Sequence, residues 1–274
     1  MNVFDIIGPV MIGPSSSHTA GAVRLGRVAW KILGDKVVKA DITLSGSFAQ
    51  TYRGHGTDKA LIAGVMGMDS DDERIRHSLQ LAKEGGMEFA FHETEIPGAH
   101  PNTARVTVTG AQGGTAVIQG ASIGGGNILI TEINGMAVSF TGQYNTLLVL
   151  HYDKPGTIAA VTNFMAYSEV NIGNFRLSRP KKGGEAVMTI EVDGALEPDV
   201  NSCVEKLPNV LSSTMLAPML RRVAQCWNIL RSRSSAGRRS RPGAPSPRPP
   251  WPIRRSRWSS RPTFCISAWR TVWV

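Results

Sequence analysis

The segment "GPSSSHTAG", residues 13–21, gathers side chains that can donate, accept and transfer protons. Four hydroxyls and one imidazole stand between a Gly-Pro pair and a glycine, directly before a run of apolar-periodic residues. Two interpretations are open: an ordinary helix N-cap, whose short hydroxylated side chains accept from the first helical N–H groups, or a site for the carboxylate and hydroxyl of an amino acid. The residues concerned are Ser15, Ser16, Ser17, His18 and Thr19.

Two further imidazoles stand in segments of the same kind. His55 lies in "RGHGTDK" and His100 in "GAHPNT", and both segments are predicted to be loops. Catalytic groups are often carried on loops, and neighbouring glycines let a substrate approach the backbone closely. One histidine alone would not favour catalysis, but the combination of three such segments does.

Residues 1–145 form the first predicted unit, and its helices and strands must position the three segments that carry the histidines. Apolar periodicity indicates a helix over 22–33, and alternation indicates a strand over 40–48. A loop is expected to follow, with Thr57 as the N-cap of the next helix.

A further helix is expected where Ser70 and Glu73 have the spacing of a capping box, with Gly85 as its end. From 88 to 144 the chain is expected to be rich in strands separated by glycines. This first unit is therefore expected to be a mixed α/β domain of the substrate-binding type.

The second unit, residues 146–220, is predicted to have the order βαββαβ, with a hairpin at 179–185 and Pro198 opening its second helix. This order packs two helices on one face of an antiparallel sheet, so the fold class of the whole is α+β. About 70 residues make a small core, and we expect the unit to pair with another copy or with the first unit.

The second unit resembles the ACT domain, a regulatory module that commonly binds amino acids. The resemblance rests on the βαββαβ order, on "DKPG" after the first strand and on "VNI" before the second. Backbone N–H groups at the helix start that follows "DKPG" would favour a carboxylate, although the same order is also a common fold that binds no ligand. The effector-binding residues that the resemblance implies are Asp153, Pro155, Gly156, Asn171 and Ile172.

Residues 221–274 differ in composition from the rest of the chain. They hold 13 Arg, no Lys, Asp or Glu, and five of the six Trp. The net charge of +9 therefore comes from this segment, because the remaining 17 basic and 21 acidic residues give −4. A nucleic-acid-binding tail, a disordered linker and an out-of-frame translation are all open; the composition favours the last, and we expect a non-native or disordered tail.

Cysteine content and hydropathy give no indication of a disulfide-rich, metal-binding or membrane-spanning protein. The three cysteines, Cys203, Cys226 and Cys265, support neither a disulfide framework nor a complete metal site. No basic leader precedes an apolar segment, and no apolar run reaches the ~18 residues of a membrane span. We expect a cytoplasmic protein that binds neither membrane nor nucleic acid.

Four motifs carry a second resemblance. "GPSSSHTAGAVR", "GSFAQTYRGHGTDKALIAGVMG", "HPNT" and "GASIGGGNILI", followed by the ACT-like unit, resemble the β subunit of iron-sulfur-dependent L-serine dehydratases, which is also the N-terminal half of single-chain forms. The resemblance spans residues 1–220. It implies a lyase of amino-acid metabolism and gluconeogenesis that converts L-serine to pyruvate and ammonia, and it implies an oligomer.

The resemblance also implies a cofactor and a partner. In this family a [4Fe-4S] cluster, held by cysteines of the α part, acts as a Lewis acid on the serine hydroxyl. Because residues 1–220 offer only Cys203, placed on an expected helix, this chain alone is predicted to be inactive without an α subunit or domain.

By the same resemblance, His55 is the candidate base, since a neutral imidazole can remove the α proton, and His18 is a second catalytic candidate. Residues 15–19 are expected to bind the substrate carboxylate or to line the cleft. The remaining residues carried over as substrate-binding are Thr57, Asp58, His100 and Asn102.

Two other functions stay open at this stage. "SIGGGN", residues 122–127, is similar to the phosphate loops of pyridoxal-phosphate dehydratases, but Lys59 lacks the surroundings expected of a Schiff-base lysine. The chain is otherwise compatible with a purely regulatory subunit that senses an amino acid and contributes no catalytic residue.

Overall fold

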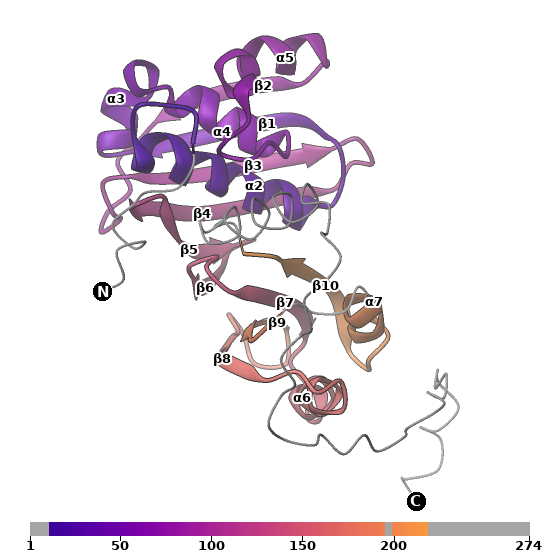
Figure 1. The fold of residues 1–274 in the computed structure, drawn as a ribbon. Helices are drawn as coiled ribbons and strands as arrows, with labels where there is room; N and C mark the ends of the chain where they lie inside the picture. Colours follow the sequence, from indigo (N-terminus) through magenta and orange to yellow (C-terminus); the bar gives the residue numbers. More distant parts are fainter. Residues whose placement is uncertain (1–10, 195–198, 219–274) are drawn as a thin grey trace, which may run out of the picture. The chain divides into compact units, whose positions relative to one another are not determined.

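The computed structural model describes residues 11–194 and 199–218. Its first part is a six-stranded sheet in the order β2-β1-β3-β4-β5-β6 (Figure 1), in which β1 and β2 are parallel and every other pair is antiparallel. The bounds are β1 Val37–Ser45, β2 Glu88–Glu93, β3 Thr103–Gly110, β4 Thr115–Gly124, β5 Asn127–Ile133 and β6 Met136–Phe140.

Helices cover one face of this sheet (Figure 1). Ile42 of β1 and Val106 of β3 point into the core and are fully buried, whereas their neighbours Asp41, Arg105 and Thr107 remain on the polar face. Period-two alternation therefore assigns one apolar face to the helix layer. The helices are η1 Ser16–Gly21, which is π-helical, α2 Ala22–Leu33, α3 Ser47–His55, α4 Thr57–Val65, the 3₁₀ turn η2 Glu73–His77 and α5 Ser78–Glu84.

Two glycines let α2 and α4 cross in direct backbone contact. A Cβ atom on Gly26 would overlap the carbonyl oxygen of Leu61, and one on Gly64 would overlap that of Val23. Neither position has room for a side chain. Since α2 follows η1 and α4 follows α3, this crossing fixes the relative position of the two segments that carry His18 and His55.

The second sheet has the antiparallel order β10-β7-β9-β8. Its core includes Leu147 and Ile190 from the sheet and Val161, Met165 and Val204 from the helices. The predicted βαββαβ order is confirmed, as is the hairpin before residue 185. The elements are β7 Asn145–Tyr152, α6 Thr157–Tyr167, β8 Ile172–Ser178, β9 Glu185–Val192, α7 Asp199–Glu205 and β10 Val210–Leu216.

The prediction for residues 40–56 was wrong in part. The strand ends at Ser45 and, after Gly46 with φ +58°, the expected loop is the helix α3. The reason is tertiary: Phe48 and Tyr52, four residues apart, are buried in the core and offset the low helix propensity of Gly54.

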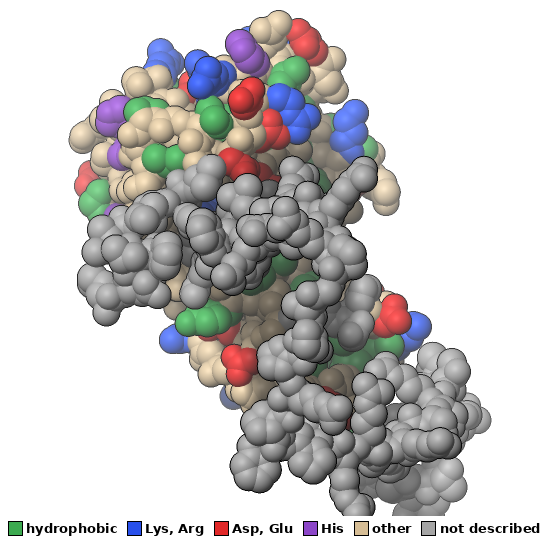
Figure 2. Space-filling view, in the orientation of Figure 1, with side chains coloured by type: hydrophobic (Ala, Val, Ile, Leu, Met, Phe, Trp, Pro, Cys, Tyr) green, Lys and Arg blue, Asp and Glu red, His purple; other side chains and the backbone are tan. Residues whose placement is uncertain are grey.

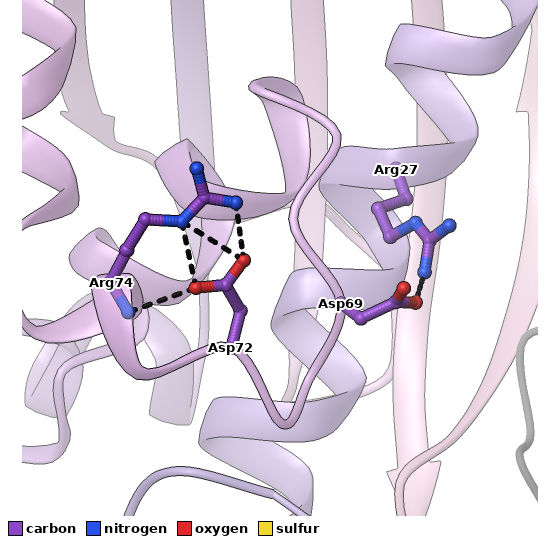
Figure 3. A network of polar contacts seen from close by, with 4 residues as sticks. All are labelled: Arg27, Asp69, Asp72 and Arg74. Carbon is purple, nitrogen blue, oxygen red and sulfur yellow. Dashed lines mark hydrogen bonds and ion pairs between the residues drawn. The ribbon is translucent and has the colours of Figure 1, made fainter.

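Two predicted helix caps were also wrong. Gly56 occupies the N-cap of α4, and Thr57 is the first residue of that helix, fully buried. The capping box at Ser70 is replaced by Asp72, whose Oδ1 accepts from the N–H of Arg74 at 2.9 Å and whose carboxylate also binds the Arg74 guanidinium (Figure 3). Because the Asp72 carboxylate binds both the backbone N–H and the guanidinium of Arg74, the helix cap lies two residues after the predicted Ser70.

Three predictions for the helices of the first unit agree with the structure, although the helix predicted after Ser70 is divided into the 3₁₀ turn η2 and the α-helix α5. The helix 22–33 and its end at Gly34, which has φ +68°, are confirmed, as is the end of α5 before Gly85. Pro198 and residues 221–274 lie outside the described residues, and the boundaries at 145 and 220 stay predictions. No helix in the described ranges is both long and apolar enough to span a membrane.

Candidate functional site

His18 of η1 and His55, the last residue of α3, lie side by side. Their ring centroids are 4.7 Å apart and the rings meet edge to face at 83°. The ring of His18 also packs against Phe48, with centroids 5.2 Å apart. Two histidines 37 positions apart in the sequence thus form one pair, and a buried aromatic side chain packs against it.

A serine hydroxyl stands near each ring nitrogen of His18. Ser15 Oγ lies 3.4 Å from Nδ1 and Ser47 Oγ lies 3.5 Å from Nε2. Ser15 is also the N-cap of η1, since its Oγ accepts from the backbone N–H of His18 at 3.2 Å. The cap interpretation of "GPSSSHTAG" therefore holds for Ser15 without excluding a role beside the imidazole.

Sequence reasoning did not single out Ser47 or Phe48. Both stand at the end of the strand predicted for residues 40–48, and neither has a local sequence signal for a site. The sequence signal that could have indicated them is Gly46. This glycine adopts φ +58°, ends the strand and caps α3, whose first residue Ser47 lies beside His18. The pair Gly-Ser at a strand end indicates a change from strand to helix only if the following residues are themselves predicted to be helical.

The electrostatic environment keeps His18 neutral near pH 7. Partial burial lowers its pKa below the ordinary value of ~6.5, and the neighbouring His55 lowers the pKa further. His55 itself is exposed. Asp58, on the first turn of α4, is half-buried, and burial raises the pKa of its carboxyl group.

The third predicted loop, "GAHPNT", is attached to the same region. The N–H of Phe48 donates to the carbonyl of Pro101 at 3.3 Å, and Asn102 exchanges hydrogen bonds with the backbone of Ser122 on β4. The Nδ1 of exposed His100 accepts from the N–H of Asn102 at 3.1 Å. The structure therefore brings "HPNT" against the start of α3, with one nitrogen of His100 engaged within its own loop.

The other sequence-predicted residues of this unit are placed differently. Ser16 and Ser17 are half-buried in the first turn of η1. Thr19 and Thr57 are 2% and 0% exposed, and neither hydroxyl has a hydrogen-bond partner. Both threonines lie within the packed helix layer, so a substrate beside the histidines does not reach them in this conformation.

The predicted effector residues do not form one site within the chain. Asp153 is engaged by its own domain: its Oδ2 accepts from Arg179 at 2.7 Å and from the Gly183 N–H at 3.0 Å. Asn171 donates to Asp193 Oδ2 at 2.6 Å. The register of β9 places these two clusters at opposite ends of that strand, roughly 24 Å apart at ~3.4 Å per residue.

Within the first cluster, Gly156 has φ +89° and is the N-cap of α6, and Pro155 is exposed. Within the second, Ile172 is the first residue of β8. The "DKPG" turn and the "VNI" segment are therefore separate features of the domain.

The described residues do not fit a metal cluster. They contain no group of three or more His, Cys, Asp or Glu side chains arranged to hold a metal ion, and their single cysteine, Cys203 on α7, is a free thiol. An iron–sulfur cluster needs several thiolates.

Comparisons with known proteins decide the family. Residues 2–132 match the serine dehydratase beta chain family, and residues 147–212 match the AHAS small subunit-like ACT domain. The chain is 45% identical to the probable L-serine dehydratase, beta chain, of Bacillus subtilis over 216 residues, which cover 79% of this chain and 98% of that one. The chain belongs to the serine dehydratase beta chain family.

Other relatives extend the comparison. The chain is 37% identical to the L-serine dehydratase, beta chain, of Peptoniphilus asaccharolyticus, over 74% of this chain and 92% of that one. It is 25% identical to the D-3-phosphoglycerate dehydrogenase of Bacillus subtilis over 71% of this chain and 37% of that enzyme. The family resemblance and the α+β fold with an ACT-like second unit are thereby confirmed.

Proposed function

We propose that this member of the serine dehydratase beta chain family supplies the proton-transfer groups of an L-serine dehydratase and works with an α subunit or domain. The observation that carries the proposal is the edge-to-face pair of His18 and His55, flanked by the hydroxyls of Ser15 and Ser47, in a chain of this family. The overall reaction takes L-serine to pyruvate and ammonia.

His55 is proposed to remove the α proton of serine. It is the exposed member of the pair, and its neighbour His18 stays neutral, so the pair has capacity for the incoming proton near pH 7. The C–H electron pair forms the new Cα–Cβ double bond, and the hydroxyl leaves from Cβ as water after taking up one proton from the histidine pair. The resulting aminoacrylate tautomerises to an imine, which water hydrolyses to pyruvate and ammonia.

The polar groups beside the pair are proposed to orient the substrate. Ser15, Ser16 and Ser17 present hydroxyls at the start of η1, where the helix dipole also favours a carboxylate. Asp58, His100 and Asn102 lie on the segments that surround the pair and are proposed to line the remainder of the cleft.

The departing hydroxyl needs an electrophile, which the described residues do not provide. The family resemblance assigns that role to a [4Fe-4S] cluster, and we place its ligands in the α part, because the described chain lacks the thiolates for it. The isolated chain is accordingly proposed to be inactive.

Reconstitution tests the proposal. The purified chain is mixed with the α part under anaerobic conditions and pyruvate is measured. Substitution of a positioned general base is expected to lower kcat by about 10²–10⁴-fold, so His55→Ala should cause a loss of this size. The matched control is His77→Ala, an exposed histidine on η2.

The alternative is a regulatory subunit that senses an amino acid through its ACT-like unit, with the "DKPG" turn of Asp153, Pro155 and Gly156 as the proposed effector site. The match of residues 147–212 to an ACT family favours keeping it. Unchanged turnover in His55→Ala, with normal assembly and normal amino-acid response, would replace our proposal by this one.

A further inference from the structure

Arg24 is a buried cation for which the described residues supply no counter-ion. It lies in the first turn of α2 with 3% of its surface exposed. Within the described ranges its guanidinium makes one hydrogen bond, from Nη1 to the carbonyl oxygen of Gly126 in the β4–β5 turn, and it forms no ion pair. The Nε–H group is buried, and no described residue accepts a hydrogen bond from it.

The neighbouring arginine does not balance this charge. Arg27, one turn later on α2, is itself a cation and forms an ion pair with Asp69 (Figure 3). Burial first, and then repulsion from Arg27, lower the pKa of Arg24 to about 10. Burying a guanidinium without an anion is costly, so a positive charge retained at this place calls for a ligand.

Two further buried hydroxyls, on the elements that adjoin Arg24 and the turn, make no hydrogen bond within the described residues. They are the hydroxyl of Thr19, on η1 just before α2, and the hydroxyl of Ser122, on β4 just before the turn. Ser122 lies against the backbone of η1, because a Cβ atom on Gly21 would overlap its Oγ. Unsatisfied buried donors are rare in folded proteins and indicate a missing partner.

The turn that accepts the hydrogen bond of Arg24 consists of three consecutive glycines. Gly124, Gly125 and Gly126 have φ values of +100°, +60° and +76°, a region that L side chains rarely adopt. Three consecutive glycines can leave this conformation without a steric penalty from side chains. Withdrawal of the turn would expose the guanidinium to a ligand.

We propose that Arg24 binds a carboxylate, which enters beside the glycine turn and pairs with the free Nε edge of the guanidinium. With Nη1 engaged by Gly126, the Nε–H and the N–H of Nη2 that points the same way form the edge that a carboxylate grips with two hydrogen bonds. One unbalanced positive charge matches one monoanion, whereas a phosphate dianion would leave a buried negative charge.

The carboxylate has two possible sources. A free amino acid, L-serine above all, would make Arg24 a substrate-binding residue, and this case rests on the proposed function. An acidic side chain or C-terminus of the α part would make Arg24 an anchor of the assembly. The chemistry is the same, and the experiment separates the two.

The first arm uses the full chain alone and follows its thermal unfolding at constant ionic strength with acetate, L-serine or L-serinamide. A ligand that binds only the folded chain raises the midpoint. If the source is free, acetate and L-serine raise the midpoint by several degrees and L-serinamide, which lacks the carboxylate, does not. Arg24→Met abolishes the rise, whereas Arg105→Met, which removes a surface arginine paired with Glu132, preserves it.

The second arm measures the affinity of the chain for the α part without substrate. If the carboxylate belongs to the partner, Arg24→Met weakens the pair by roughly 30-fold or more, and free carboxylates have no effect on the wild-type chain. Arg24→Lys retains the charge but loses the two-donor edge, so it should weaken whichever interaction exists, and it serves if Arg24→Met does not fold.

Unchanged behaviour of both variants in both arms, or an equal response of Arg24→Lys and wild type, would overturn the proposal. Neither arm involves turnover. A pair that binds carboxylates through Arg24 but makes no pyruvate would refute the proposed function and leave this inference standing.

Discussion

His18 illustrates how its immediate neighbours set the protonation of a single residue. Its folded-state pKa is lower than its unfolded value of ~6.5. The unfolded chain therefore binds the proton more tightly, and this residue's contribution to stability is complete above pH ~6.5 and declines as the pH falls from there through the folded pKa. Folding favours the neutral imidazole, which is the form able to accept a proton.

Replacing the partner imidazole should raise the pKa of His18. In His55→Asn the repulsion from a second protonated ring is removed, while the larger effect of burial remains. We expect the His18 pKa to move upward yet stay below ~6.5. Titration of the His18 Cε1–H resonance by NMR measures it, with His77→Asn as the control.

A pKa that stays constant or falls in His55→Asn would contradict the electrostatic coupling of the pair. The same titration tests the geometry independently of catalysis, because it needs no α part. Compared with the turnover of the reconstituted variants, the titration also separates the loss of the electrostatic coupling between His18 and His55 from the loss of His55 as the base.

At the scale of elements, the α2–α4 crossing determines whether the two histidines meet. Gly64→Ala would force a methyl group into the carbonyl oxygen of Val23, so we expect a loss of about 1–3 kcal/mol in the free energy of unfolding. Gly54→Ala is the matched control: this exposed helical glycine of α3 has no atom near its Cβ position, and alanine should stabilise the helix by up to ~1 kcal/mol.

Urea denaturation of the two variants gives both values. Equal stability of Gly64→Ala and wild type would mean that α2 and α4 can separate without a loss in the free energy of unfolding. The close crossing of these two helices would then not determine the position of η1 against α3. The His18 titration described above would show whether the separation moves the rings apart.

The sequence predicted the elements whose signals are local and strong. The helix 22–33 has a sustained apolar period and a terminal glycine, and the second unit has clear alternation between turns. The helix α3 was missed because two glycines and a histidine near its end suggest a loop, and only burial of Phe48 and Tyr52 reveals the helix.

The candidate site was predictable in its histidines but not in their arrangement. His18 and His55 were selected by residue type and flanking glycines, whereas their pairing depends on the long-range contact of η1 with α3. Ser47 and Arg24 could not have been selected, since their importance lies in proximity to His18 and in burial without a counter-ion. Neither property has a local signal in the sequence.

The β8–β9 hairpin binds the carboxylate of Asp153, so we expect the stability of the second unit to fall in acid as Asp153 is protonated. Its hydrogen bonds from Gly183 and Arg179 lower the pKa of the carboxyl group. A lowered carboxyl pKa contributes stability above the unfolded value of ~3.9 that is lost as pH falls through the folded value. Asp153→Asn should therefore be less stable than wild type at pH 7, and the difference should shrink in acid.

Urea midpoints at pH 7 and near pH 3 measure this difference, and Asp41→Asn, on the polar face of the first sheet, is a comparison in which the second unit is unchanged. A difference between Asp153→Asn and wild type that is constant across the pH range would show that the carboxyl does not titrate with folding.

At the scale of the whole chain, charge is divided between segments of opposite character. On the face drawn in Figure 2, Lys, Arg, Asp and Glu side chains of the described residues are interspersed, without a large field of one sign. Residues 1–220 carry 17 basic and 21 acidic residues, and the other 13 basic residues all lie in 221–274. The candidate site and the candidate carboxylate site both lie within residues 15–126.

Deleting residues 221–274 should therefore reverse the charge of the protein and preserve its function. The net charge changes from +9 to −4, so at pH 7 the shortened chain should bind an anion exchanger and no longer a cation exchanger. Pyruvate production with the α part should stay within about twofold of the full chain, since the family matches end at residue 212 and the proposed groups are untouched. A large loss of turnover in a chain that still folds would instead assign residues 221–274 a part in the assembly, and the basic, tryptophan-rich segment would then have to be treated as a contact for the partner.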